Sequence, residues 1–522
     1  MPKSVQPGYS TVVTGDSITQ ANSSATNNSH GDTWATYMAL ASGGRMRLVR
    51  NYAIGGQRTT AIAARFPNDV LSENSRIILI ATGTNDINWT TETLASLESM
   101  IQQARAKGIA VGLLTPPPRG MPKFVSPSTA SITATTFTSS GTLAAGSYEY
   151  TITGRVSGGA GGQEGLPVAT VPVTLSATGT VNLKWPRQNV ARWHIYRRTQ
   201  GSSTWGFIGG IGEGYGRADT YPYFVDNGLT PTAQQPPTAD VLGSGNSTEN
   251  VPGNIPGVSP AVPLATQISS IRQVALGLAQ KYGLPLVDQY LILTDAATGL
   301  FKAGMTQDGV HPDALTQRDM GVNAWSKLQD MFPRAALGWM SIDPRYTGTM
   351  LGARQNQTGG TSNGALLPAV NGATAPTGWG FYGEPTSTGS ITTETGIAGN
   401  IFTITGGAYA IRIGEGPALA VGTDFVAGDR IRVGFMLKVS GLDINSGAVR
   451  LQVFYGGGVT PGNLTDLQLT ADVPSWSVWT AEETVPAGAT TMQFRMSVTG
   501  AGVALSVAQL TMENLTRRGL VS

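Results

Sequence analysis

The order of expected strands and helices constrains this chain most, because one α/β pattern occurs in two separated stretches. Residues 9–118 alternate apolar runs that predict buried strands with amphipathic runs that predict helices. This order is typical of a parallel sheet with helices on both faces. The pattern stops at Thr115–Pro118 and resumes near Pro263. A single α/β domain split by an insertion accounts for both stretches.

The elements expected in the α/β part follow from continuous apolar runs and from helical periodicity. Strands are expected at Tyr9–Thr14, Met46–Asn51, Arg76–Ala81, Ile109–Leu114 and Leu284–Val287. Helices are expected at Thr33–Ala41, Thr93–Lys107, Ala265–Tyr282 and about Ala314–Met331. The sequence therefore predicts an α/β fold whose two halves lie far apart along the chain.

The remaining sequence has the character of antiparallel β-structure. Gly, Ser, Thr and Pro dominate from Lys123 to Asn250, where short runs such as Trp193–Arg197 alternate apolar and polar residues. From Gly338 onward the alternation returns, in runs such as Arg430–Phe435, over a length suited to a jelly roll of about eight strands. The predicted domains are residues 1–122 and 251–337 for the α/β fold, 123–250 for a β-sandwich insertion and 338–522 for a C-terminal jelly roll.

Composition excludes several classes of function. The 34 basic and 32 acidic residues give a net charge of +2 and form no long run of either sign, so a nucleic-acid partner has no support. The absence of Cys excludes disulfides, a Cys nucleophile and thiolate metal sites. No apolar run is long enough to span a membrane, and Met1–Ser10 lacks the apolar core of a signal peptide. Export by another route, or removal of a signal, stays open.

A candidate nucleophile follows the first expected strand. Ser17 belongs to Gly15-Asp16-Ser17, and α/β folds bind ligands at the carboxyl ends of their parallel strands. A Ser at that point can also offer its own backbone N–H to an oxyanion. A Gly-Asp-Ser tripeptide arises easily by chance in a chain this rich in Gly and Ser.

Three histidines are candidates for the base of a serine hydrolase. His194 alternates with apolar residues, which is typical of a packed or surface strand position. His30 lies in a polar Asn/Ser loop and is expected to be solvated, although it could border a pocket near Ser17. His311 follows Asp308 by three residues, immediately before an expected helix, so one loop could hold both a base and its orienting carboxylate. A polar turn before a helix is the alternative.

Two further strand ends carry groups suited to an oxyanion. Gly55-Gly56 follows the second expected strand, and Gly83-Thr84-Asn85-Asp86 follows the third. A glycine N–H and an asparagine amide are both suitable donors. Ordinary strand-end turns are the alternative, because Gly and Asn favour such turns.

Together, these motifs resemble the SGNH hydrolase superfamily, also called GDSL esterases and lipases. The resemblance covers Ser10–Thr115 and Pro263–Met331 and implies its three-layer α/β fold with a parallel sheet. It implies two-step acyl transfer through an acyl-enzyme, with no metal or organic cofactor. The residues that match the family's positions are Ser17 as nucleophile and N–H donor, Gly56 and Asn85 as the other oxyanion donors, His311 as base and Asp308 as its orienter. The adjacent Gly55 leaves the glycine position open by one residue.

The two β-regions carry resemblances of their own. The insertion is similar to a fibronectin type III-like module, through Gly146–Tyr150, Leu183–Trp185, Trp193–Arg198 and Tyr223–Gly228. The C-terminal region is similar to jelly-roll carbohydrate-binding modules, through Trp476 and Trp479, Val485–Ala489 and Ala504–Leu515. Aromatic residues that could stack on sugar rings are Trp379, Phe381 and Tyr382, although we favour core packing for them. A structural or trimerising role is open as well.

These resemblances lead to a functional hypothesis. It is an esterase that removes acyl groups, of which acetyl is expected, from a polysaccharide. The β-regions and the missing Cys and signal peptide suggest a phage tail enzyme acting on host surface glycan, located outside the cell or on the virion. Expected partners are the acylated polysaccharide, with a homo-oligomer or other tail proteins left open. Alternatives are a non-catalytic glycan-binding adhesin, and a long-chain lipase or thioesterase of the same fold.

Overall fold

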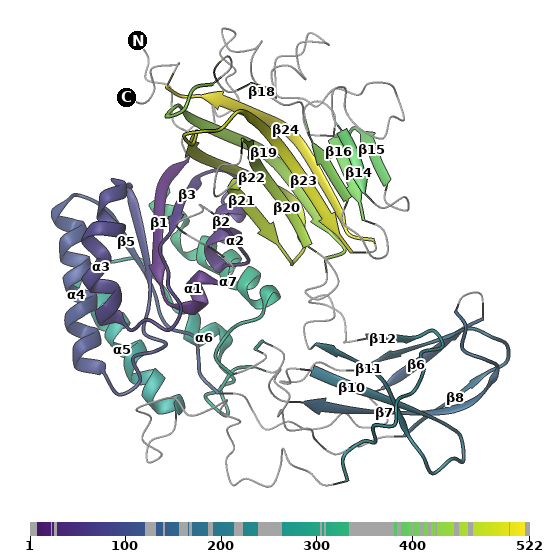
Figure 1. Ribbon diagram of the computed structural model, residues 1–522. Helices are drawn as coiled ribbons and strands as arrows, with labels where there is room; N and C mark the ends of the chain where they lie inside the picture. Colours follow the sequence, from purple (N-terminus) through teal and green to yellow (C-terminus); the bar gives the residue numbers. More distant parts are fainter. Residues whose placement is uncertain are drawn as a thin grey trace. The chain divides into compact units, whose positions relative to one another are not determined.

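The computed structural model contains a parallel sheet with helices, β-strands inserted between elements of that α/β part, and further β-strands toward the C-terminus (Figure 1). The residues that the structure describes are 8–21, 23, 25, 29–120, 132–138, 141–155, 165, 167, 170–185, 192–212, 223–238, 264–302, 305–306, 309–332, 380–383, 388–395, 397, 401–406, 412–415, 419–420, 422, 425–442, 448–457, 463–500 and 502–516. The chain divides into two compact units. The first comprises Met1–Pro116, Ile271–Gln289 and Gln317–Ser522, and the second comprises Pro117–Ser270 and Tyr290–Thr316.

A five-stranded sheet forms the centre of the α/β part, and all of its pairs are parallel. Its strands are β1 (Tyr9–Gly15), β3 (Met46–Asn51), β4 (Ile77–Ala81), β5 (Ala110–Leu114) and β13 (Leu286–Val287), in the order β13-β5-β4-β1-β3. The chain passes from β1 to β3 on one side and then returns to β4 on the other side of β1. Such a reversal opens a crevice at the carboxyl ends of the strands, where α/β folds bind ligands.

Helices cover both faces of this sheet (Figure 1). On one face, α3 (Thr59–Asp69), α4 (Thr90–Ala106) and α5 (Leu264–Tyr282) share a core with β1, β4 and β5. The other face carries α2 (Trp34–Ala41) and α7 (Ala314–Leu328). A Cβ added at Gly321 of α7 would lie 2.4 Å from the Trp34 carbonyl oxygen, so these two helices pack closely. The shorter helices are α1 (Ser17–Gln20), η1 (Leu71–Glu73), α6 (Gln289–Leu293) and η3 (Gln329–Met331).

The inserted region consists of two antiparallel sheets. Its strands are β6 (Thr133–Phe137), β7 (Gly146–Arg155), β8 (Val171–Leu175), β9 (Thr180–Lys184), β10 (Arg192–Thr199), β11 (Gly206–Gly212) and β12 (Tyr223–Asp226). The sheets have the orders β11-β10-β7-β8 and β12-β9-β6. Both contribute to one apolar core, in which the rings of Trp185 and Trp193 meet at 5.5 Å. The region therefore has a core of its own, while its similarity to fibronectin type III stays a prediction.

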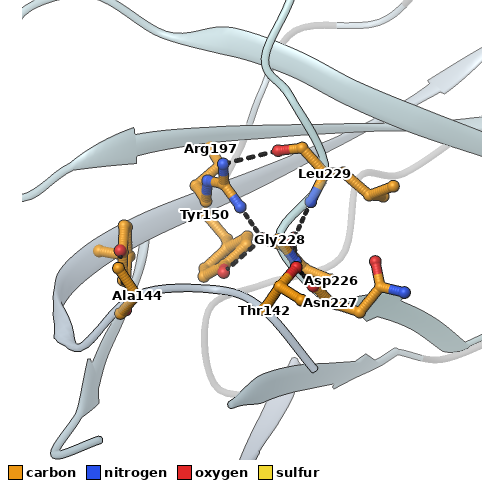
Figure 2. A network of polar contacts seen from close by, with 9 residues as sticks. Thr142, Ala144, Tyr150, Arg197, Asp226, Asn227, Gly228 and Leu229 are labelled. Carbon is orange, nitrogen blue, oxygen red and sulfur yellow. Dashed lines mark hydrogen bonds and ion pairs between the residues drawn. The ribbon is translucent and has the colours of Figure 1, made fainter. Parts of the chain in front are cut away.

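A buried polar network joins the two sheets of the insertion (Figure 2). Asp226 at the end of β12 is 0% exposed and accepts hydrogen bonds from the Tyr150 hydroxyl at 2.8 Å and from Arg197 at 2.5 Å. The same carboxylate accepts the backbone N–H groups of Gly228 and Leu229, at 3.1 and 3.2 Å. Because Tyr150 lies on β7 and Arg197 on β10, this network links one sheet to the other.

The C-terminal region also forms two sheets. Its strands are β14 (Gly380–Gly383), β15 (Thr388–Thr392), β16 (Ile401–Thr405), β17 (Arg412–Glu415), β18 (Leu419–Ala420), β19 (Arg430–Ser440), β20 (Ala448–Gly456), β21 (Asn463–Leu469), β22 (Val473–Thr484), β23 (Thr491–Thr499) and β24 (Ala504–Asn514). One sheet has the order β15-β16-β24-β19-β22, and the other runs β14-β17-β23-β20-β21 with β18 also on β23. Phe435 of β19 meets Phe494 of β23 at 5.5 Å, so the sheets share a core. The jelly-roll topology stays a prediction.

A short strand from the α/β part extends the second of these sheets. This strand is β2 (Ser29–His30), which pairs in parallel with β21. Next to it, Asp32 accepts the backbone N–H of Thr470 at 2.8 Å and its hydroxyl at 2.6 Å. Arg47 of β3 forms an ion pair at 3.0 Å with Glu482 of β22, and both side chains are almost fully buried. The C-terminal strands thus share buried contacts with the α/β part.

The expectation that His30 is solvated was wrong. The side chain is 1% exposed, and its ring meets that of Trp479 edge-on at 5.2 Å. Burial, and to a smaller extent the charge of Arg50, lowers the pKa of His30 from 6.5 to about 3. Pairing of β2 with β21 carries the residue into the interior, and no local feature of its polar loop indicates that distant partner. Trp479, part of the proposed carbohydrate-binding pattern, is likewise a core residue at 1% exposure.

Candidate active site

Ser17 lies just past the carboxyl end of β1 and is the first residue of helix α1. The preceding Gly15 is needed for space, because a Cβ there would come within 2.2 Å of the Ala81 carbonyl oxygen on β4. Asp16 caps α1 by accepting the Ile18 N–H at 3.1 Å, and its other oxygen accepts the Thr84 N–H at 3.3 Å. The Gly and Asp of the motif therefore lock the turn that presents Ser17 and link it to the loop after β4.

The Gly55-Gly56 turn after β3 lies next to Ser17. A Cβ added at Gly55 would be 3.6 Å from the Ser17 Cβ. The Gly55 N–H donates to the Gln20 side chain at 2.7 Å, so this donor already has a partner. Gly56 is exposed and has a φ of +75°, which favours glycine, and a Cβ there would meet no described atom within 4 Å. Of the two glycines, Gly56 is the better candidate for an oxyanion donor.

Asn85, in the loop after β4, is held against the same turn. Its side-chain amide donates to the Gln57 carbonyl at 3.1 Å, which uses one of the two amide hydrogens. Its neighbour Asp86 is buried and accepts the Thr59 N–H at 3.1 Å and the Thr59 hydroxyl. Burial raises the pKa of Asp86 above 3.8, although the hydrogen bonds from Thr59 oppose that rise. The loop after β4 thus anchors both the Gly56 turn and the start of α3.

The segment directly after Ser17 is clamped by buried polar side chains. Gln317 of α7 donates to the Ile18 carbonyl at 2.9 Å and accepts the Trp34 N–H at 2.9 Å. Thr19 accepts the Trp34 indole N–H at 3.1 Å on its hydroxyl. Asn51 donates to the Thr19 carbonyl at 2.6 Å. Because these groups are buried and paired, they restrict the backbone of α1 and hence the position of Ser17.

The predicted base lies in the second unit. His311 is exposed, in a loop before α7, and its carbonyl accepts the Thr306 hydroxyl at 2.9 Å. That loop is held at Gly309, whose carbonyl accepts the Gly120 N–H at 2.8 Å. Asp313 caps α7 by accepting the Thr316 N–H at 2.8 Å. The predicted orienter, Asp308, lies outside the described residues.

The predicted residues thus fall into two groups. Ser17, the Gly55-Gly56 turn and Asn85 are brought together by the contacts within the first unit. His311 belongs to the second unit, so its approach to Ser17 remains a prediction. Of the other two histidines, His30 is buried beside Trp479 and His194 is a buried strand residue of β10.

Several residues of this site were not predicted from the sequence. They are Gln20, which occupies the Gly55 N–H; Asp86 and Thr59, which hold the loops together; and Gln317, which clamps Ile18. The only signal for Asp86 was its place at a strand end. Gln317 carried none, because its partner lies 299 residues away.

Within the part of the chain that the structure describes, no three His, Asp or Glu side chains are grouped so that they could hold a metal ion. Among the described helices, none is both long and apolar enough to cross a membrane.

Comparison with known proteins gives one family match. Residues 13–136 match the GDSL-like Lipase/Acylhydrolase family, over about a quarter of the chain. The matched stretch includes Ser17, Gly56 and Asn85. No curated protein matches.

Solved structures show weaker similarities. The enzymatically active domain of bacteriophage CBA120 tailspike protein 4 is 10% identical, with a TM-score of 0.21, over 26% of this chain and 19% of that one. A putative lipolytic protein of the G-D-S-L family from Desulfitobacterium hafniense is 20% identical, with a TM-score of 0.19, over 22% and 62%. The acetyl xylan esterase AlAXEase is 14% identical, with a TM-score of 0.29, over 61% and 98%. This chain covers less than two thirds of the length of the first two of these structures.

Proposed function

We propose that this chain is a serine esterase that hydrolyses O-acyl groups, above all O-acetyl, on a polysaccharide. The observation that carries the proposal is the convergence on Ser17 of the loops after β1, β3 and β4. The residues proposed as nucleophile and as two kinds of oxyanion donor come from loops at the carboxyl edge of one parallel sheet. The family match over residues 13–136 supports an acylhydrolase.

Each residue has a defined part in the proposed reaction. His311 accepts the proton of the Ser17 hydroxyl while the Ser17 oxygen attacks the ester carbonyl carbon. The negative charge on the carbonyl oxygen is held by the N–H groups of Ser17 and Gly56 and by the Asn85 amide. As the tetrahedral adduct collapses, the C–O bond to the sugar breaks and the protonated His311 gives its proton to the leaving oxygen. Asp308 orients the imidazole.

Water completes the cycle. His311 accepts a proton from the water that attacks the acyl-Ser17 carbonyl. As the second adduct collapses, the bond from the carbonyl carbon to the Ser17 oxygen breaks and His311 returns the proton to that oxygen, which releases the carboxylic acid and restores the Ser17 hydroxyl. The Gln317 clamp on the Ile18 carbonyl helps catalysis by keeping the Ser17 hydroxyl and N–H in fixed positions.

The proposed setting follows from the rest of the chain. Two β-regions accompany the acylhydrolase part, as suits an enzyme that works on an extended glycan. We propose the surface polysaccharide of a bacterial host as substrate and the exterior of the cell or a phage tail as location, with self-association or other tail proteins as partners. A survey of activity on acetylated glycans would identify the sugar.

Substitution of the triad tests the proposal. Ser17→Ala should reduce hydrolysis of 4-nitrophenyl acetate by about 10⁴-fold or more without changing the melting temperature. His311→Ala should have nearly the same effect, and Asp308→Asn a smaller one. The hydrolysis rate of the wild type should increase with pH, with a midpoint near neutrality as expected for a histidine base. A folded Ser17→Ala protein that keeps near wild-type turnover, or inactivation by a change at His30 in place of His311, would disprove these assignments.

A further inference from the structure

An exposed aromatic side chain borders the proposed active site. Trp89, the residue before α4, is 41% exposed, and so is Ile54 beside the Gly55-Gly56 turn. The backbone of Trp89 is fixed, because its N–H donates to the Asp86 carbonyl at 2.8 Å and its own carbonyl accepts the Thr93 N–H at 2.9 Å. The loop that presents Asn85 therefore also presents an indole ring to solvent.

A cation holds this ring in place. The guanidinium carbon of Arg58 lies 4.3 Å from the centre of the Trp89 ring. Arg58 directly precedes Thr59, which is bonded to Asp86, and Trp89 follows Asp86 by three residues. Asp86, whose buried carboxylate joins the loops of the site, therefore also positions the segments that carry Arg58 and Trp89.

The pair also lies close to Ser17. Gly55 approaches Ser17 within contact distance, as shown by the 3.6 Å between its added Cβ and the Ser17 Cβ. Arg58 is the third residue after Gly55, and three residues of extended chain span at most about 11 Å. A group covalently attached to an ester bound at Ser17 could therefore reach the Arg58–Trp89 pair.

Comparison with two similar pairs shows what is distinctive here. Arg198 lies over Trp205 in the insertion but is hydrogen-bonded to Glu149 at 2.6 Å. Lys438 lies over Trp476 in the C-terminal region, where Glu394 accepts hydrogen bonds from both side chains at 2.9 Å.

The pair beside Ser17 lacks such a glutamate. Among the described residues, none accepts a hydrogen bond from the Arg58 guanidinium or from the Trp89 indole N–H. This pair therefore combines a tryptophan that is 41% exposed with N–H donors that no described residue uses, near a candidate nucleophile.

We propose that Arg58 and Trp89 form a subsite for a pyranose ring attached to the ester. The C–H face of the sugar stacks on the indole, and its hydroxyl or carboxylate oxygens accept hydrogen bonds from Arg58 and the indole N–H. This subsite rests on the proposed esterase function, to which it adds that the sugar next to the acyl group is recognised. Its contacts are present in the ground state as well as the transition state, so they act mainly on KM.

Kinetics on two substrates test the subsite. Ethyl acetate is suitable as the ring-free substrate, because an aromatic ester could itself stack on Trp89; the second substrate is the acetylated polysaccharide that the wild type hydrolyses best. Trp89→Ala should lower kcat/KM on the polysaccharide by about tenfold, mainly through KM, and change that on ethyl acetate by less than about twofold. Trp89→Phe should retain most of the activity, and Arg58→Ala should act in the same direction as Trp89→Ala. As a control, Val322→Ala, which shortens an exposed apolar side chain of α7, should leave kcat/KM unchanged on both substrates.

Binding to an array of deacetylated polysaccharides separates this inference from the proposed function. In the Ser17→Ala background, Trp89→Ala should weaken binding by a similar factor. If the wild type hydrolyses no ester but its glycan binding depends on Trp89, the esterase proposal fails and the subsite stands. Equal effects of Trp89→Ala on both substrates, or glycan binding that is absent or independent of Trp89, would overturn the subsite.

Discussion

The inserted and C-terminal β-regions are both built from two antiparallel sheets, but they differ in what their cores depend on. The insertion buries its own tryptophans and closes its sheets with the network around Asp226. The C-terminal strands fall in the same compact unit as the parallel sheet, joined to it by β2, Asp32 and the Arg47–Glu482 pair. One region is therefore expected to be separable, and the other to be part of the body of the enzyme.

The two regions show that the place of a region in the sequence does not indicate whether its core depends on the α/β part. The insertion interrupts the α/β sequence, yet the α/β elements before and after it complete one parallel sheet. The C-terminal region follows the α/β sequence as an appended module would, yet its Glu482 forms ion pairs with Arg47 of β3 as well as with Arg430 and Arg432 of β19. Burial opposes ionisation of Glu482, but the three arginines outweigh it and hold its pKa below 4.5.

Removal of the C-terminal region should have the largest effect. A chain ending at residue 337 loses the partners of Arg47, Asp32 and His30, which the full chain buries. We expect the shortened protein to be insoluble or to lose its cooperative thermal transition, because burial without partners is unfavourable. Circular dichroism melts of the soluble fraction would show this. A truncated protein that melts like the full chain would mean that the C-terminal region is an independent module.

Glu482→Gln should have the next largest effect. It leaves Arg47 and Arg432 buried without a countercharge, which costs about 3–5 kcal/mol of unfolding free energy. Calorimetry should show a lower transition temperature for the unit that contains the parallel sheet. The matched change Asp226→Asn should lower only the transition of the insertion, because Arg197 loses its partner there. If both substitutions shift the same transition, the distinction between the two regions is wrong.

The stability of the junction should depend on pH through His30. Its pKa is about 3 in the folded chain and 6.5 ordinarily, so between these values the unfolded chain binds more protons. Stability is therefore full above pH 6.5 and falls as the pH decreases, by about 1.4 kcal/mol for each pH unit. Glu482, whose pKa is lowered in the folded chain, adds to this loss only below its ordinary pKa of 4.5, so between pH 6.5 and 4.5 the loss comes from His30 and not from Glu482.

The variant His30→Phe isolates that contribution. Denaturant unfolding at several pH values should give a flatter dependence for His30→Phe than for the wild type. Asp32, whose pKa is raised by burial, acts in the opposite direction and is present in both proteins. Identical pH profiles would show that His30 does not titrate with unfolding.

Deletion of the insertion should have the smallest effect on a small ester. Replacing residues 123–250 by a short flexible linker keeps Ser17, Gly56, Asn85, Asp308 and His311. It also keeps Gly120, which holds Gly309. Activity on 4-nitrophenyl acetate should stay within about threefold, whereas kcat/KM on polymeric acetylated glycan should fall more steeply through loss of remote contacts. Equal losses on both substrates would make the insertion a structural support, and no loss on polymer would exclude it from substrate recognition.

Sequence patterns predicted the α/β fold well where the signal was local. The apolar runs of β1, β3, β4 and β5 located these strands within about one residue, because strands buried on both faces are continuously apolar. Helix α3 was missed because Pro67 and the neighbouring Asn68-Asp69 resemble a turn. The strand at Leu284–Val287 was predicted too long, since only Leu286–Val287 pairs with β5.

Long-range pairing was the part that no pattern could indicate. Strand β2 is two residues long and gains its stability from β21, more than 400 residues away. For the site, the meeting of the Ser17, Gly55 and Asn85 loops followed from the order of parallel strands. The sequence did not show which of the two glycines has a free N–H, because that depends on the Gln20 side chain.

The central claim, that Ser17 is a nucleophile activated by His311, is tested most directly by a fluorophosphonate, which reacts only with an activated serine. Peptide mass spectrometry of the treated full-length protein should locate a single adduct on Ser17. The adduct should be absent from Ser17→Ala and should form much more slowly in His311→Ala. No adduct on the folded wild type, an adduct on another serine, or labelling of Ser17 at an unchanged rate in His311→Ala would contradict the claim.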